Sequence, residues 1–211
     1  MNIAIAETII PTPFMEDTRS VRLHFDFEDQ TRRMTPDEFW EFCSRNRKLR
    51  AELTKEGDVV IMAPTGFESS ELNLEILLQL GTWARRDKTG TVTESNGAYV
   101  LPNGATYAPD AAWIKRERLE MFSDEEKQRF LPLCPDFVIE LRSSSDSLSK
   151  LRSKMDEWIE NGARLAWLVD PFQKKVYIYR PGNEPNILDD PASVSGEDVL
   201  PGFVLDLAKV W

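Results

Sequence analysis

Apolar residues recur at helical spacing in three segments of the chain. The first segment opens at residues 35–38, Thr-Pro-Asp-Glu, which combine an N-cap threonine, a proline at the first helical position and a glutamate three residues after the cap. Phe39, Trp40 and Phe42 then give this segment an apolar side. The pattern predicts a helix that runs to about Asn46.

Two longer segments predict helices that pack one face on a core. Their apolar positions are Leu72, Ile76, Leu80 and Trp83 in one, and Leu148, Leu151, Met155, Trp158 and Ile159 in the other. We expect the first of these helices to begin at Ser70 or Glu71 and to run to about Arg86. The second should end at residues 161–162, Asn-Gly.

Short apolar runs predict β-strands in the first half of the chain. Residues 50–53 and 59–62 lie on either side of Gly57, a pattern that favours a hairpin with this glycine in its turn. Residues 91–93 and 98–101 are separated by turn residues, and we expect them to form a meander.

Further strands are predicted in the second half. Residues 110–114 predict a buried strand after Pro109. The polar stretch 115–133 predicts a surface insertion that contains a short helix beginning at Ser123. Residues 165–169 and 175–179 predict a second hairpin.

The strand at residues 135–142, Pro-Asp-Phe-Val-Ile-Glu-Leu-Arg, carries a carboxylate in an otherwise apolar run. Alternation places Val138, Glu140 and Arg142 on one face of this strand. Asp136 shares that face but lies about 13 Å from Glu140 by strand rise. This separation is too large for the two acids to share a metal ion.

Composition indicates one globular domain. The chain has 211 residues, of which 41% are hydrophobic and 29% charged. We interpret residues 1–34 as an N-terminal arm and residues 35–211 as a single domain. No apolar stretch is long enough for a membrane span and the start has no basic signal region, so we expect a cytoplasmic protein. Two cysteines and one histidine support neither a disulfide framework nor a zinc site.

The formal net charge of −10 opposes simple nucleic-acid binding, which draws its non-specific affinity from lysine and arginine. Basic groups are nevertheless concentrated at residues 45–50 and around Lys150, Arg152 and Lys154. A local positive patch on an acidic body is therefore compatible with the composition.

Several short motifs occur in a fixed order along the chain. They are Glu52 before Gly57, residues 62–66 (Met-Ala-Pro-Thr-Gly), 101–104 (Leu-Pro-Asn-Gly), 108–110 (Ala-Pro-Asp), 135–143, Lys154, 167–171 (Trp-Leu-Val-Asp-Pro) and 200–203 (Leu-Pro-Gly-Phe). In this order they resemble the Uma2 family, also called DUF820, of the PD-(D/E)XK nuclease superfamily. The resemblance implies an α/β (α+β) fold with a restriction-endonuclease-like central mixed β-sheet flanked by helices.

The resemblance also implies a divalent-metal phosphodiesterase site. Asp110 and Glu140 would be metal-ligating carboxylates, the main-chain carbonyl of Leu141 a further ligand, and Glu52 a supporting acid. Hard oxygen ligands of this kind suit Mg²⁺ or Mn²⁺, which supply a Lewis acid and an activated water for phosphodiester hydrolysis.

The cation of the family motif differs in this chain. Arg142 stands where the motif has lysine and is one candidate for the functional cation of the catalytic set, although a guanidinium cannot act as a general base. Lys154 is the candidate for a relocated lysine, because at about 100° per residue it lies about 40° from Trp158, at the edge of the apolar stripe. Ser144 also stands where the family more commonly has proline.

Structural roles remain open for the same residues. Glu140 could form a buried ion pair with Arg142 or Lys154, and Asp110 could cap the turn after Pro109. Lysine beside an apolar stripe is ordinary in an amphipathic helix.

Three functions are compatible with these observations. The first is a metal-dependent endonuclease that acts on DNA, working as a homodimer. The second is a non-catalytic homodimeric interaction or regulatory protein that retains the nuclease fold. The third is a hydrolase of a small phosphate ester, which predicts a closed pocket where a nuclease predicts an open cleft rimmed by lysine and arginine.

Overall fold

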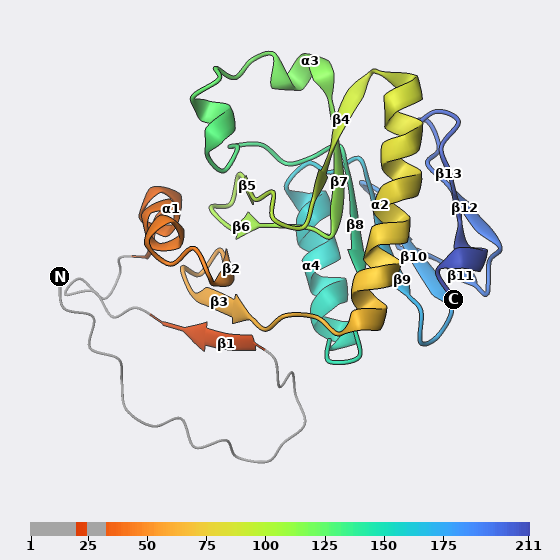
Figure 1. The fold of residues 1–211 in the computed structure, drawn as a ribbon, viewed down its shortest axis with the longest axis horizontal. Coiled ribbons are helices and arrows are strands. Elements are labelled where there is room, and N and C mark those ends of the chain that lie inside the picture. The colour runs from red at the N-terminus through yellow and green to blue at the C-terminus, as the bar shows by residue number, and fades with distance from the viewer. Residues whose placement is uncertain (1–19, 25–32) are drawn as a thin grey trace.

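The computed structural model describes residues 20–24 and 33–211, which form three β-sheets with helices packed around them (Figure 1). The α-helices of this part of the chain are Pro36–Arg45 (α1), Phe67–Asp87 (α2), Arg116–Leu119 (α3) and Leu148–Glu160 (α4). Short 3-10 helices lie at Glu126–Gln128 and Leu207–Lys209. No helix among the described residues has the length and apolar character needed to cross a bilayer.

A six-stranded mixed sheet forms the centre of the fold. The strand order of this sheet is β11-β10-β9-β8-β7-β4. Strands β8 and β9 pair in parallel, and every other pair of neighbouring strands in the sheet is antiparallel. The strands are β4 (Gly90–Glu94), β7 (Ala111–Lys115), β8 (Phe137–Leu141), β9 (Leu165–Asp170), β10 (Lys175–Tyr179) and β11 (Asn186–Asp189). The predicted central mixed sheet flanked by helices is confirmed.

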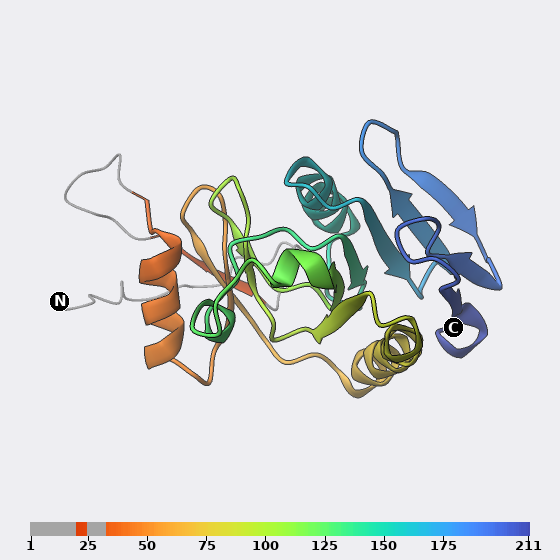
Figure 2. The same cartoon turned by 90° about the horizontal axis from the view of Figure 1, so that it is seen from above.

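Helices α2 and α4 cover opposite faces of this sheet, as Figure 2 shows from above. Alternation along β8 explains the two layers, because successive side chains of a strand point to opposite faces. Phe137 and Ile139 pack in the cluster that contains Ile76 of α2, whereas Val138 packs in the cluster that contains Met155 of α4. The predicted two-faced pattern of β8 is therefore confirmed.

A second sheet of five strands lies beside the first. Its order is β1-β3-β2-β6-β5, from β1 (Ser20–Leu23), β2 (Arg50–Leu53), β3 (Val59–Met62), β5 (Tyr99–Val100) and β6 (Thr106–Tyr107). The predicted hairpin of β2 and β3 is confirmed, with Gly57 at φ +89° in its turn. A small third sheet pairs β12 (Ser193–Ser195) with β13 (Val204–Asp206).

The predicted meander of residues 91–93 and 98–101 is wrong. Strand β4 pairs with β7 in the central sheet, whereas β5 pairs with β6 in the five-stranded sheet. A turn closed by a hydrogen bond from the Gly97 N–H to the Glu94 carbonyl carries the chain between the two sheets. Turn residues at this point therefore mark a change of sheet.

Helix boundaries follow the local chemistry closely. The capping box of α1 is present, because Thr35 Oγ1 accepts from the Glu38 N–H and the Glu38 carboxylate accepts from the Thr35 N–H. Helix α2 begins at Phe67, earlier than expected, with Gly66 as an N-cap that makes no side-chain hydrogen bond. Within the predicted arm, β1 pairs with β3, and residues 1–19 and 25–32 lie outside the described part.

Gly90 offers a direct test of the packing of β4 on β7. A Cβ atom at this position would lie 2.3 Å from the Trp113 ring and 2.4 Å from the Ile114 carbonyl oxygen. We expect Gly90→Ala to lower the free energy of unfolding by about 1–3 kcal/mol, because neither neighbour can move without disturbing the sheet. Urea denaturation followed by circular dichroism measures this change.

Gly66→Ala is the matched control, since a Cβ atom there meets nothing within 4 Å. We expect a loss below about 1 kcal/mol for this variant, because alanine is a poorer N-cap residue than glycine but meets no steric conflict here. Equal stability of the two alanine variants would contradict the close approach of Gly90 to Trp113.

Candidate active site

The register of β7 against β8 brings two carboxylates face to face. Ala111 pairs with Ile139 and Ala112 with Val138, so continuing the ladder by one residue places Asp110 opposite Glu140. Ala112 and Val138 both pack in the cluster on the α4 side, and Asp110 and Glu140 share their face by alternation. Opposed residues of antiparallel strands have Cβ atoms about 5 Å apart, which is close enough for two carboxylates to interact.

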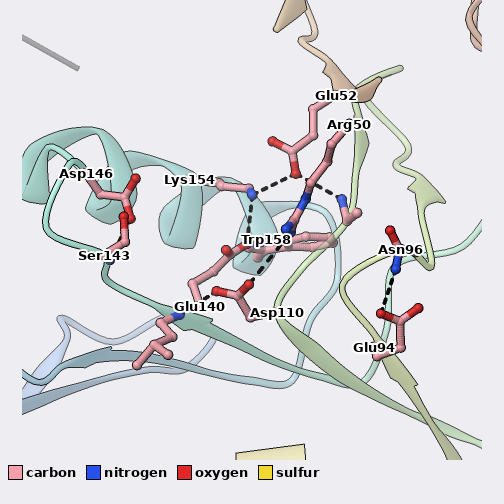
Figure 3. A network of polar contacts seen from close by, with 12 residues as sticks. Arg50, Glu52, Glu94, Asn96, Asp110, Glu140, Ser143, Asp146, Lys154 and Trp158 are labelled. Atoms are coloured by element: carbon pink, nitrogen blue, oxygen red, sulfur yellow. Dashed lines mark hydrogen bonds and ion pairs between the residues drawn. The ribbon is translucent and has the colours of Figure 1, made fainter. Parts of the chain in front are cut away.

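Asp110 is anchored by the backbone of the neighbouring strand. Its Oδ2 accepts a hydrogen bond of 2.8 Å from the Leu141 N–H, and its Oδ1 lies 3.8 Å from Nη2 of Arg50 (Figure 3). Burial raises the pKa of Asp110 above its ordinary value, and the carboxylate of Asp146 adds to the rise, while the Leu141 N–H, Lys154 and Arg50 oppose it. The structure therefore gives Asp110 a role beyond capping a turn.

Glu140 is held through one of its two oxygens. Oε1 accepts from the indole Nε1 of Trp158 at 3.0 Å and from Nζ of Lys154 at 2.9 Å. Burial raises the pKa of Glu140 to about 7; Lys154 opposes this rise, and the carboxylates of Asp110 and Glu52 add to it. The site thus concentrates negative charge that its own cations offset only in part.

Lys154 bridges the two sheets. Its ammonium lies 2.9 Å from Glu140 Oε1 and 2.9 Å from Glu52 Oε1, and it stands 5.2 Å from the centre of the Tyr107 ring. Burial alone would lower the pKa of Lys154, but the carboxylates of Glu140 and Glu52 outweigh it and hold this pKa above its ordinary value. The lysine is therefore a charged group near neutral pH.

Glu52 reaches the site from the five-stranded sheet. It lies on β2, and its Oε1 accepts from the Ala108 N–H at 3.0 Å as well as from Lys154. This oxygen therefore ties β2 to the segment that leads into Asp110. The structure brings together Glu52, Asp110, Glu140 and Lys154 from four separate segments of the chain.

These groups lie in an open cleft of about 850 Å³. The cleft runs from β2 and β3 across the first turns of α2 and α4. Its cations are Arg22, Arg50, Lys55, Lys150 and Lys154, and its carboxylates are Glu52, Glu56, Asp110, Glu140, Asp146 and Glu157. Serine and threonine hydroxyls fill much of the remaining wall. The cleft therefore mixes five cations with six carboxylates and has no excess of positive side chains.

Arg142 lies outside this cleft. It follows the last residue of β8, and its Nη1 donates to Oδ2 of the fully buried Asp170 at 2.7 Å. Asp136 is also remote from the site, because it accepts from the Lys115 N–H and pairs with Arg118 at the other end of β8. The expected catalytic set is thus gathered except for Arg142.

Two contacts of the site were not expected from the sequence. Trp158 was interpreted as a core residue, yet its indole N–H orients Glu140. Tyr107, beneath the Lys154 ammonium, donates from its hydroxyl to Glu157, which also accepts from Asn103. The spacing of four residues from Lys154 to Trp158 places both on one side of α4, which is the only signal of the first contact in the sequence.

The donor set fits a hard divalent cation with few protein ligands. No three acidic, histidine or cysteine side chains of the described residues converge closely enough to hold a metal ion by themselves. Mg²⁺ often needs only one or two carboxylates, with water and substrate phosphate completing its shell. Asp110 and Glu140 meet this requirement, and a cation would offset the burial and the neighbouring negative charges that raise their pKa values.

Comparisons with known proteins agree with this architecture. A comparison with curated proteins gives no match. Among solved structures, a putative nuclease belonging to DUF820 from Anabaena variabilis matches with a TM-score of 0.68 at 19% sequence identity, over 84% of this chain and 97% of that chain. This likeness shows a shared fold. The family model Uma2, described as "Putative restriction endonuclease", matches residues 36–208. Since this match spans most of the 211 residues, the chain belongs to the Uma2 family.

Proposed function

We propose that this protein is a metal-dependent endonuclease that hydrolyses phosphodiester bonds of DNA at a PD-(D/E)XK-type site. The observation that carries the proposal is the convergence of Asp110, Glu140 and the buried ammonium of Lys154 in one open cleft. Two opposed carboxylates without a full complement of cations suit a divalent metal, and a fixed ammonium beside them suits a charged phosphate.

Asp110, Glu140 and the main-chain carbonyl of Leu141 would hold Mg²⁺ or Mn²⁺. When bound, such an ion supplies a Lewis acid for the phosphoryl oxygen and lowers the pKa of a bound water. The carboxylates are already oriented for this task, because Glu140 Oε1 is fixed by Trp158 and Lys154 and Asp110 Oδ2 is fixed by the Leu141 N–H. The second oxygen of Glu140 is kept for a ligand, whereas the second oxygen of Asp110 lies 3.8 Å from Nη2 of Arg50, with which a bound metal ion would compete.

Lys154 takes the place of the motif lysine, but it lies on helix α4 and not at the end of strand β8. Because Glu140 and Glu52 hold it protonated, its role is to orient water or to stabilise the additional negative charge on the phosphorus centre, and it does not act as a general base. Arg142 has no such role in this proposal, since its guanidinium is engaged by Asp170.

DNA is the proposed substrate because the cleft is open and has Arg22, Arg50, Lys55 and Lys150 along its walls. The phosphates of a DNA strand would contact these cations, and a bound divalent metal ion would offset the carboxylates that share the cleft. Such contacts make binding steeply dependent on salt. A small phosphate ester would show weak salt dependence in the same measurement.

Asp110→Asn tests the metal site without removing its anchoring hydrogen bond, because an asparagine oxygen can still accept from the Leu141 N–H. We expect calorimetry to detect Mg²⁺ or Mn²⁺ binding to the wild type and at least about tenfold weaker binding to this variant. The rate of nicking of supercoiled plasmid at low salt should fall together with the metal affinity. The melting temperature should rise slightly, because one buried charge that repels Glu140 is lost.

Glu52→Gln is the matched control, since a glutamine oxygen can still accept from both the Ala108 N–H and Lys154. Its metal affinity should stay within about threefold of the wild type, because Glu52 is not a proposed ligand. Metal binding without cleavage would redirect the proposal to another phosphate ester. Absence of metal binding by the folded wild type would favour a non-catalytic protein that retains the fold.

Lys154→Met removes the ammonium but keeps much of the aliphatic stem. We expect plasmid nicking to fall by about 100-fold or more if the charge acts on the phosphate. The variant should also lose about 3–5 kcal/mol of stability, because Glu52 and Glu140 are left without their cation. Activity is therefore measured at a temperature where circular dichroism shows the variant folded. Retained activity in the folded variant would assign Lys154 a purely structural role.

A further inference from the structure

Helix α2 has apolar residues on two opposite sides. Its inner side packs Ile76 and Leu80 into the core of the central sheet. On its outer side Phe67 is 84% exposed, Leu74 57% and Leu78 55%. These three residues are spaced by seven and four positions, so they form one stripe along the helix. Figure 2 places α2 at the edge of the molecule, with this outer side facing away from the central sheet.

Gly81 lies near the same stripe and packs against nothing in the described part of the chain. It occupies the interior of a helix of 21 residues, where glycine is unfavourable relative to alanine. A Cβ atom built on Gly81 would meet nothing within 4 Å, so no described part of the chain requires its small size. Glycine on a helix surface permits the close approach of a second backbone.

Two charged residues are placed symmetrically about Leu78. Glu71 lies seven residues before it and Arg85 seven residues after it, and seven residues are close to two helical turns. Both are exposed on the outer side of α2, and neither has an ion-pair partner within residues 20–24 and 33–211. Leu78 therefore has an acidic residue and a basic residue at equal distances on either side of it along the helix.

We propose that the outer face of α2 around Leu74, Leu78 and Gly81 is a homodimer interface. Two copies of α2 pack antiparallel about a two-fold axis at Leu78. This arrangement places Glu71 of each protomer opposite Arg85 of the partner subunit, and it covers Leu74 and Leu78 of the apolar stripe. A surface that is complementary to its own two-fold copy is the requirement for a closed dimer.

The occupant is a second copy of the chain because the pattern on α2 is self-complementary. A different partner would need an apolar stripe but not equal and opposite charges on both sides of one leucine. Gly81 lies three residues after the axis and faces Glu75 of the partner subunit, where a small residue lets the helices approach. The proposal does not rest on the nuclease function, and it concerns residues outside the catalytic set.

Leu78→Glu is the first test, with sedimentation velocity of the full chain over a concentration series as the measurement. We expect the wild type to be a dimer and the variant to have a dissociation constant at least roughly 30-fold higher, since two buried carboxylates would meet at the axis. Met121→Glu is the matched control, because Met121 is 81% exposed and lies outside α2. The control should dimerise as the wild type does.

A charge exchange tests the antiparallel register. Glu71→Arg and Arg85→Glu should each weaken association by roughly tenfold, because each single change creates two like-charge pairs. The double variant Glu71→Arg/Arg85→Glu restores opposite charges in the same dimer and should recover the wild-type dissociation constant. Rescue of this kind cannot arise if α2 is covered by another segment of the same chain.

Cross-linking tests the position of the axis. In a Cys43→Ser background, Leu78→Cys should form a disulfide-linked dimer on mild oxidation, because a residue on the axis meets its own copy. Thr82→Cys should not, since four residues from the axis place the two thiols about 12 Å apart along the helices. Circular dichroism shows that each variant is folded.

Three results would overturn the proposal. The wild-type chain could remain a monomer at every concentration, the dimer could be unaffected by Leu78→Glu, or the double charge variant could fail to recover association. The first excludes a homodimer, the second moves the interface elsewhere, and the third rejects the antiparallel register. None of these three results concerns plasmid nicking. A failure of the dimer proposal would therefore leave the proposed nuclease function in place.

Discussion

The placement of Lys154 between Glu52 and Glu140 is the interaction on which the site depends. The β7 and β8 register forces Asp110 and Glu140 together on the face covered by α4, where burial makes two negative charges unfavourable. A single ammonium from α4 offsets much of that charge and also reaches Glu52 on the other sheet. The same contact therefore docks α4, joins the two sheets and shapes the cleft.

Under the proposed function, this arrangement explains how a helix can supply the cation that the motif has on the strand. Strand β8 ends at Leu141, and the Arg142 N–H donates to the Val169 carbonyl of the parallel strand β9. Its guanidinium then pairs with Asp170, on the next residue of β9. The Arg142 side chain is therefore engaged by strand β9 and lies outside the cleft that contains the carboxylates. Lys154 reaches them because α4 crosses the face on which they lie.

Much of the fold could be predicted from local patterns, whereas pairing between distant segments could not. The capping box at Thr35, the turn at Gly57 and the alternation around Glu140 are set by neighbours in sequence, and each prediction is confirmed. Strands β5 and β6 have two residues each, too few to reveal their sheet, and the expected meander was wrong. The indole contact of Trp158 depends on how α4 is rotated against β8, which periodicity alone does not determine.

Helix α2 contributes residues both to the cleft and to the proposed dimer interface. Its length determines how far each cleft lies from the two-fold axis. Ser69 and Ser70 on its first turn line the cleft, whereas Leu78 lies two turns further along. With the two-fold axis at Leu78, Ser70 of each protomer lies about 12 Å from the axis along the helix, in opposite directions. No residue of one protomer is then required to complete the cleft of the other. The carboxylates, Lys154 and the anchoring Leu141 N–H all come from a single chain, so assembly can position two clefts without altering the chemistry within either.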